Sequence, residues 1–189
     1  LKSGKYLQIN LSTDAMAEVS DDLVTWKDAG RIVPEEDQVD VNGYRCIIIH
    51  VNTPTEYKLE NGTSRIFCPI VFRRYDVSGS AILGHFSRVY YSDDGGYTWE
   101  ASATSTKDIL PNYSEEGNTT WAESKIVKCS DGTFRMYYSR NYFGCMQYTV
   151  SKDGGVTWEG LYQIPEMQCA MTSFAVIEDP GEEGTYYML

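Results

Sequence analysis

Residues Ser92–Trp99 (SDDGGYTW) and Ser151–Trp158 (SKDGGVTW) repeat one eight-residue pattern, S-x-D-x-G-x-T-W. We call these two copies the Ser92 box and the Ser151 box. Their first serines lie 59 residues apart, from 92 to 151, in a chain of 189 residues. A pattern of this length that recurs at such a distance indicates a repeat architecture, in which each copy belongs to one structural unit.

The chemistry of the box predicts a tight hairpin turn. Its Asp-Gly and Gly-Gly steps supply the positive φ angles that such a turn needs. The hydroxyl groups and the aspartate carboxylate are suited to bind backbone N–H groups of the turn. The tryptophan at the end is suited to pack against a neighbouring strand. The box residues therefore indicate architecture and not catalysis.

A third and weaker copy occurs earlier in the chain. Residues Ser20–Trp26 (SDDLVTW), the Ser20 box, keep the serine, aspartate, threonine and tryptophan but lack the glycine and are one residue shorter. We interpret this copy as a degenerate repeat. It lies farther from the Ser92 box than the Ser92 box lies from the Ser151 box, so one repeat carries a longer insertion.

Composition excludes several classes of function. The chain has 16 basic and 27 acidic side chains, a net charge of −11. Nucleic acid is not an expected partner, because binding phosphates requires a basic face. The five cysteines show no C-x-x-C spacing, so we expect no metal site. The sequence contains no signal peptide and no apolar run long enough for a transmembrane segment.

Short strand patterns separated by turn signals run through the whole chain. Residues 104–120 are mostly polar and without periodicity, which predicts a long loop, and no helix of useful length is expected. This spacing of strands and turns predicts an all-β fold, a β-propeller of four-stranded antiparallel blades. The expected strands are 6–11, 17–20, 44–51, 65–73, 86–91, 123–129, 133–140, 145–150, 172–178 and 184–189.

The length of the chain suits only part of such a propeller. Six four-stranded blades need roughly 24 strands of about 5–6 residues each, plus turns, which is more than 189 residues hold. The chain also starts at Leu1 and not at a methionine, and ends inside a strand-like run. We therefore expect about three to four blades, with residues 1–189 forming a partial propeller domain that is truncated at both ends.

The hairpin over residues 121–140 is the most informative stretch for function. If Asp131-Gly132 forms a two-residue type I′ turn, Glu123 lies opposite Arg140 on one face at the open end of the hairpin. In one interpretation these residues form an ordinary cross-strand ion pair, which is worth little when exposed. In the other they form a Glu–Arg pair that lines a cleft.

The order of motifs between residues 86 and 176 resembles the middle of bacterial-type exo-α-sialidases, six-bladed propellers in which the box is known as the Asp box. The first good box is followed by a long loop, an E-S strand, an Asp-Gly turn, YYSRN at 137–141, GCMQY at 144–148, the second box, and CAMTS at 169–173. In the family the arginine follows the turn glycine one residue sooner, a difference that a β-bulge would explain.

The resemblance implies a retaining hydrolase that releases terminal sialic acid from glycoconjugates without a cofactor. The family uses a tyrosine nucleophile partnered by a glutamate, an aspartate acid/base, and three arginines that clamp the substrate carboxylate. Glu123 matches the glutamate and Arg140 the second arginine, while Gln168 lines the pocket by its family position. The other catalytic residues would lie outside 1–189, so the fragment alone should be inactive.

The resemblance has three further implications. The partners are glycans that contain sialic acid, and the location is secreted or cell-surface. Arg65 stands in a stretch (RIFCP) similar to the strand that carries the family's first arginine. Its position suits a later blade, which favours an ordinary strand residue.

Two other classes of function stay open. A non-catalytic propeller with the same boxes would bind glycans or proteins, because fold does not determine function. Another propeller glycosidase, of the arabinanase kind, would use three inward-facing carboxylates in place of an arginine clamp. The Ser20 box is in keeping with that kind of enzyme, but no such trio of carboxylates is evident in the sequence.

Overall fold

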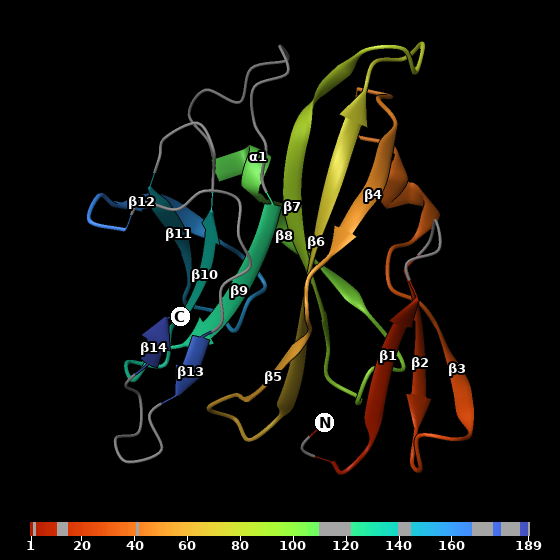
Figure 1. Ribbon diagram of the computed structural model, residues 1–189, viewed down its shortest axis with the longest axis vertical. Helices are drawn as coiled ribbons and strands as arrows, with labels where there is room; N and C mark the ends of the chain where they lie inside the picture. The colour runs from red at the N-terminus through yellow and green to blue at the C-terminus, as the bar shows by residue number, and fades with distance from the viewer. Residues whose placement is uncertain are drawn as a thin grey trace.

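The computed structural model describes residues 1, 3–10, 15–40, 42–109, 122–139, 145–167, 176–178 and 186–188. For residues 122, 123 and 139 and for the last two short strands it describes the backbone only. These residues form antiparallel sheets with two short helical segments, which confirms the predicted all-β class (Figure 1).

The strands form four sheets in chain order, which we number 1 to 4. Sheet 1 contains β1 (Tyr6–Asn10), β2 (Met16–Ser20) and β3 (Trp26–Arg31). Sheet 2 contains β4 (Cys46–Val51), β6 (Ser64–Tyr75), β7 (Ile82–Ser92) and β8 (Glu100–Ser105), with β5 (Thr55–Lys58) paired to β6. Sheet 3 contains β9 (Ala122–Lys128), β10 (Phe134–Ser139), β11 (Met146–Ser151) and β12 (Glu159–Ile164), and sheet 4 contains β13 (Val176–Glu178) and β14 (Tyr186–Met188).

Each box occupies the same place in its sheet. The Ser20, Ser92 and Ser151 boxes lie in the turns β2–β3, β7–β8 and β11–β12, between the last two strands of sheets 1, 2 and 3. Each copy of the box therefore belongs to one blade. Three blade-like sheets and two strands of a fourth agree with the predicted propeller and with its expected three to four blades.

The hydrogen bonds of the Ser151 box show why the motif needs its residues. Ser151 Oγ accepts from the N–H of Gly155 at 2.8 Å and donates to Asp153 Oδ1 at 2.8 Å. The Asp153 carboxylate also accepts from the N–H of Thr157 at 2.9 Å and from its hydroxyl at 2.6 Å. Trp158 is buried in the adjoining core. The predicted structural role of the box is confirmed.

The degenerate Ser20 box makes an equivalent turn without glycine. Leu23 adopts a positive φ of 65°, a conformation that costs a side-chain-bearing residue more than glycine. Ser20 Oγ accepts from the N–H of Leu23 at 2.9 Å, and Asp22 Oδ1 accepts from the N–H groups of Val24 and Thr25 at 2.8 and 2.7 Å. The serine and the aspartate thus make the same kinds of hydrogen bond as in the complete boxes.

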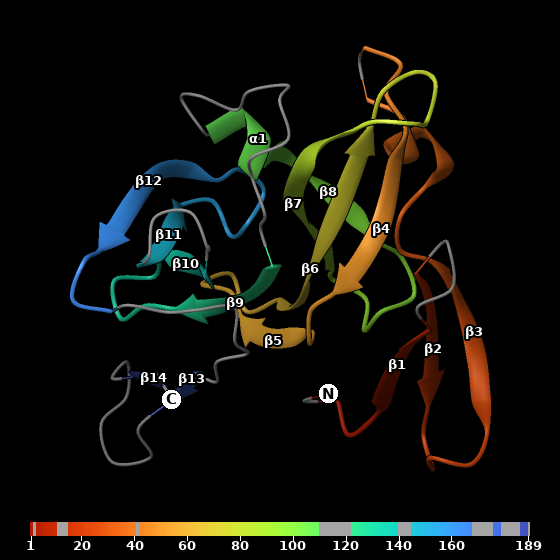
Figure 2. The same cartoon turned by 45° about the horizontal axis from the view of Figure 1, so that its top comes forward.

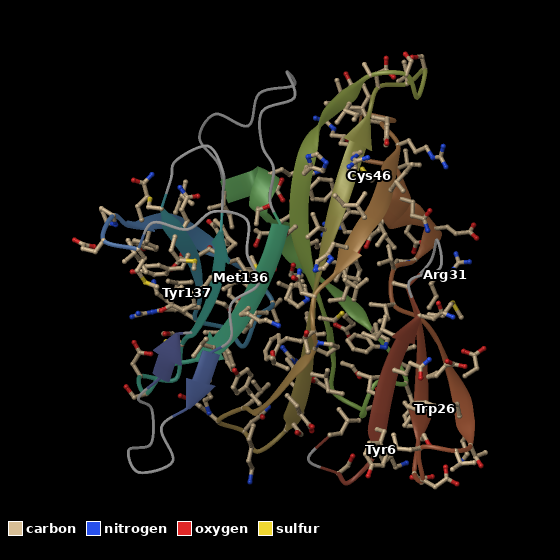
Figure 3. All side chains as sticks on the ribbon, in the orientation of Figure 1. Tyr6, Trp26, Arg31, Cys46, Met136 and Tyr137 are labelled. Carbon is tan, nitrogen blue, oxygen red and sulfur yellow. The ribbon has the colours of Figure 1, made fainter. Side chains whose placement is uncertain are left out.

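Sheet 2 lies between sheets 1 and 3 and contributes to two separate cores (Figures 1 and 2). Because side chains alternate along a strand, Phe67 of β6 faces the core shared with sheet 3, while Cys68 faces the core shared with sheet 1. Figure 3 labels a similar pair on β10, where Met136 lies in the core with sheet 2 and Tyr137 packs against the tilted ring of Tyr148 on the other face. The sheets thus pack face to face, as blades do.

Within the described residues, each of the ten expected strands occurs at least in part, and four further strands there were not predicted. Three of these, β3, β8 and β12, follow the boxes and lie at the edge of their sheets. Few residues of these three strands, WKDAGR, EASATS and EGLYQI, are buried. The predicted loop at 104–120 was wrong at its start, where β8 ends and the short helix α1 (Thr106–Ile109) follows.

We expect the boxes to make the protein sensitive to acid. Burial raises the pKa of Asp94, but hydrogen bonds from Thr98, Ser92 and Tyr97 outweigh this effect and hold that pKa below its usual value. The pKa of Asp153 is lowered by a similar balance. Each carboxylate therefore contributes stability above about pH 4, its unfolded pKa, and the contribution is lost as the pH falls through the lower folded pKa.

The test is the melting temperature between pH 7 and pH 2.5. The double variant Asp94→Asn Asp153→Asn should melt lower than the wild type at pH 7 and lose less stability below pH 4. Equal slopes in the two proteins below pH 4 would contradict a role for these carboxylates. At pH 7 the expected loss is about 2–4 kcal/mol, the cost of weakening several hydrogen bonds to charged groups.

Candidate functional site

The turn of the β9–β10 hairpin differs from the predicted two-residue turn. The N–H of Cys129 donates to Thr133 O at 2.8 Å and the N–H of Gly132 donates to Cys129 O at 3.0 Å, so the loop has three residues. Gly132 has φ +81°, as expected for a type I turn that closes through a left-handed glycine. Residues 128 and 134 are therefore paired, and the whole register moves by one residue.

This shift overturns the predicted pairing of Glu123 with Arg140. Tyr138 pairs with Ser124 and Ser139 pairs with Ala122, so Glu123 is the extra residue of an irregularity in β9. The extra residue lies in β9 and not in β10, so this bulge does not explain the spacing between Gly132 and Arg140 relative to the family. Bulges are common beside active sites, where they redirect a side chain. Glu123 thus occupies the kind of backbone position at which functional residues occur.

The other two predicted site residues cannot be placed against Glu123. Arg140 and Gln168 lie outside the described residues, and only the backbone of Glu123 is described. The assignments of Glu123 to catalysis and of Arg140 and Gln168 to substrate binding therefore stay predictions. Of the three residues, the structure defines only the backbone position of Glu123.

A buried asparagine holds the strand beside Glu123. Asn52, which follows β4, donates from Nδ2 to Pro69 O at 3.1 Å and to Ser124 Oγ at 3.1 Å. Its Oδ1 accepts from the N–H of Ser124 at 2.9 Å. Asn52 is 3% exposed and Ser124 is 1% exposed. Sequence reasoning missed Asn52, because nothing in the stretch Val51–Pro54 separates it from an ordinary loop asparagine.

Polar side chains cross sheet 3 in line with Ser124. Tyr138 pairs with Ser124 on one side and with Gln147 on the other. All three are almost fully buried, and the Gln147 carboxamide has no hydrogen-bond partner among the described residues. Gln147 belongs to the GCMQY stretch of the family resemblance. A row of buried polar groups is costly in a core and is therefore more typical of a functional region.

Arg65 is not available as a substrate arginine. Its guanidinium donates to both carboxylate oxygens of Asp93, at 2.7 and 2.5 Å, and to Gly154 O at 2.8 Å. The guanidinium carbon also lies 4.1 Å from the centre of the Tyr91 ring. Arg65 thus joins the Ser92 box to the Ser151 box, which agrees with its interpretation as a structural strand residue.

Two further arginines of sheet 2 are paired with carboxylates near the short helix η1 (Glu35–Gln38). Arg74 Nε donates to Asp40 Oδ2 at 2.6 Å, with both side chains nearly fully buried. Arg88 pairs with Asp37 at 2.9 Å, and Asp37 also accepts from the Tyr90 hydroxyl at 2.8 Å. These pairs fasten the connection between sheets 1 and 2 onto the face of sheet 2.

A hollow of about 490 Å³ lies at the box end of sheet 3. It is lined by the turns after β5, β9 and β11, including Asn61, Lys128 and Asp153. Lys128 and Glu123 are near opposite ends of β9, about 17 Å apart for a strand of this length. The hollow is therefore not part of the region around Glu123.

Among the described residues, no three potential ligands of the His, Cys, Asp and Glu types gather into a metal site. A search of the same residues for helices that are long and apolar enough to cross a membrane found none.

The arrangement of sheets is that of propeller glycoside hydrolases. No protein-family model matches the chain. Among solved structures, a β-1,3-galactosidase of glycoside hydrolase family 43 with bound galactodeoxynojirimycin superposes with a TM-score of 0.60 at 16% identity, over 98% of this chain and 64% of that one.

Two sialidases are also similar. The intramolecular trans-sialidase from Ruminococcus gnavus has a TM-score of 0.53 at 20% identity, over 81% of this chain and 27% of that one. The NanB sialidase from Streptococcus pneumoniae has a TM-score of 0.55 at 20% identity, over 89% of this chain and 22% of that one. The chain thus spans less than two thirds of the length of each of these structures. At such identities the likeness establishes the fold and not the chemistry.

Proposed function

We propose that the complete protein that contains this chain is a retaining exo-α-sialidase, secreted or cell-surface, that releases terminal sialic acid from glycoconjugates. Glu123 at the bulge of β9 carries the proposal. In the family that this chain resembles, the partner of the tyrosine nucleophile is a glutamate in an E-S strand. Glu123 lies in such a strand, at the start of the sheet that follows the Ser92 box. The sialidases with a similar fold, and the three boxes in successive sheets, support it.

In this mechanism Glu123 accepts the proton of a tyrosine hydroxyl that lies elsewhere in the complete protein. The phenolate then attacks the anomeric carbon of the sialic acid while the glycosidic bond breaks, and the leaving aglycone takes a proton from the family's acid/base aspartate, which would lie outside residues 1–189. Water, activated by that aspartate, then breaks the tyrosyl–sugar bond and releases sialic acid with retention. Arg140 binds the substrate carboxylate through its planar guanidinium, and Gln168 lines the pocket. Residues 1–189 form about half of a six-bladed domain in this proposal, and alone they lack part of the catalytic set.

A second candidate is a galactoside hydrolase. The similarity in fold to the β-1,3-galactosidase, which extends over 98% of this chain, favours it. In that case glutamate and aspartate side chains would carry the reaction, without a clamp of arginines. The two candidates differ in substrate and in their dependence on Arg140.

The test is turnover of a fluorogenic α-sialoside by the complete protein and by its Glu123→Gln variant. We expect kcat to fall at least 100-fold, the usual effect of removing a general base. Glu60→Gln is the matched control, since Glu60 lines the hollow at the opposite end of sheet 3, and it should leave kcat within about twofold of the wild type.

Three other results would contradict the proposal. A folded complete protein that hydrolyses a β-galactoside and not the sialoside would establish the second candidate. A protein that binds sialylated glycans without cleaving them would be a non-catalytic propeller. Full activity of Glu123→Gln would remove Glu123 from the catalytic set.

A further inference from the structure

Asn52 connects sheet 2 rigidly to the strand that carries Glu123. Its backbone N–H donates to Pro69 O at 2.9 Å, and its side-chain Nδ2 donates to the same oxygen at 3.1 Å. Two bonds to one carbonyl fix the orientation of the carboxamide relative to β6. The carboxamide binds Ser124 through both of its ends: Nδ2 also donates to Ser124 Oγ at 3.1 Å, and Oδ1 accepts from the N–H of Ser124 at 2.9 Å.

The contact with Ser124 falls next to the irregularity of β9. Glu123 is the extra residue between the pairs Ser124–Tyr138 and Ala122–Ser139. A bulge disturbs the ladder of backbone hydrogen bonds at its own position. Asn52 Oδ1 supplies an acceptor for the N–H of the residue that immediately follows the bulge. A buried N–H without a partner would destabilise this part of β9.

We propose that Asn52 is a positioning residue that holds the bulge of β9 and thereby the orientation of Glu123. The inference rests on the proposed function for the role of Glu123, while the contacts of Asn52 with Ser124 stand on the structure alone. Asn52 does not touch the substrate. Its effect on the reaction is indirect: if Glu123 were displaced by about 1 Å, the rate of the reaction would fall roughly 100-fold.

A second hydrogen-bonded link between the same two sheets supplies a matched control. Thr104 of β8 accepts from the N–H of Trp158 at 2.6 Å and donates to Trp158 O at 3.1 Å. Thr104 thus ties sheet 2 to the Ser151 box, as Asn52 ties sheet 2 to β9. Thr104→Val keeps the shape of the side chain and removes this link far from Glu123.

The experiment compares Asn52→Ala, Thr104→Val and the wild type in the complete protein. Three quantities are measured: melting temperature, kcat with a fluorogenic α-sialoside well below that temperature, and amide hydrogen exchange at Ser124. We expect both variants to melt lower. Only Asn52→Ala should exchange faster at Ser124, with kcat lowered 10- to 100-fold and a smaller change in KM. If Asn52→Ala does not fold, Asn52→Ser takes its place, because the serine hydroxyl still fills part of the site.

Each outcome decides one part of the inference. Unchanged exchange at Ser124 in the Asn52 variant would show that Asn52 does not hold the bulge. Faster exchange with kcat equal to that of Thr104→Val would overturn the positioning role while leaving the sialidase assignment intact. A wild-type protein with no sialoside turnover would refute the proposed function itself, and the exchange data would still show whether Asn52 holds β9.

Discussion

Replacing Gly155 by alanine should destabilise the protein by about 3–4 kcal/mol. A Cβ at this position would lie 2.3 Å from Cε1 of Phe67 and 3.1 Å from its Cδ1, far closer than carbon atoms approach. Phe67 is fully buried and packs against Phe134, with ring centres 5.0 Å apart, so it has no room to move. Overpacking of a core costs about 1–3 kcal/mol, and the φ of +90° adds about 1–2 kcal/mol for a residue with a side chain.

Urea denaturation at pH 7 measures this loss, and Gly95→Ala is its control. Gly95 has φ +81° in the Ser92 box, but a Cβ there would meet no atom within 4 Å. The control should therefore show only the backbone cost of about 1–2 kcal/mol. Equal losses in the two variants would mean that Phe67 yields to the added methyl group and that close packing at Gly155 is unimportant.

Removing the charge of Asp40 should cost about 3–5 kcal/mol. The ion pair of Asp40 with Arg74 is buried, with side chains 3% and 5% exposed. Asp40→Asn removes the negative charge that pairs with the buried guanidinium, and losing one partner of a buried ion pair is strongly destabilising. The amide can still accept from the N–H groups of Asn42 and Tyr44, as the carboxylate does at 2.8 and 3.1 Å. The turn itself should therefore persist.

The matched control for Asp40→Asn is Glu35→Gln, which removes a charge from an exposed pair. Glu35 contacts Arg31 at 2.9 Å but is 82% exposed, and pairs of this kind contribute about 0–1 kcal/mol. The double variant Asp40→Asn Arg74→Met should lose less than the sum of the two single variants, since neither charge then remains alone. These variants form a double-mutant cycle. A loss of stability below about 1 kcal/mol for Asp40→Asn, or a loss in the double variant equal to the sum of the two single losses, would show that the pair is not energetically coupled.

Local chemistry in the sequence determined where the turns and the blade repeats lie. In the Ser92 and Ser151 boxes the hydrogen bonds of the serine, the aspartate and the glycine N–H close within eight residues, so the motif predicts the same hairpin in any context. The alternating apolar strands between the boxes could also be predicted from the sequence. The edge strands after the boxes could not be predicted, because β8 and β12 bury few residues and their pairing depends on the neighbouring strand rather than on their own pattern.

The register of the β9–β10 hairpin depended on a choice that the residues alone leave open. Asp131-Gly132 suits both a two-residue turn and a three-residue turn with a left-handed glycine. The structure contains the latter, and a shift of one residue is enough to separate Glu123 from its expected partner Arg140.

The sequence by itself determined the fold class and the position of the boxes, since both depend on contacts between residues close in the chain, while the choice of Glu123 as a candidate rests on the resemblance to the sialidase family. Only the tertiary structure revealed the bulge at Glu123 and the carboxamide of Asn52 that binds Ser124, 72 residues away. It also revealed that Arg65 binds Asp93 and the Ser151 box. These features arise where two sheets pack face to face, and the partner of a buried polar group in such an interface is chosen by packing and not by neighbours in the sequence.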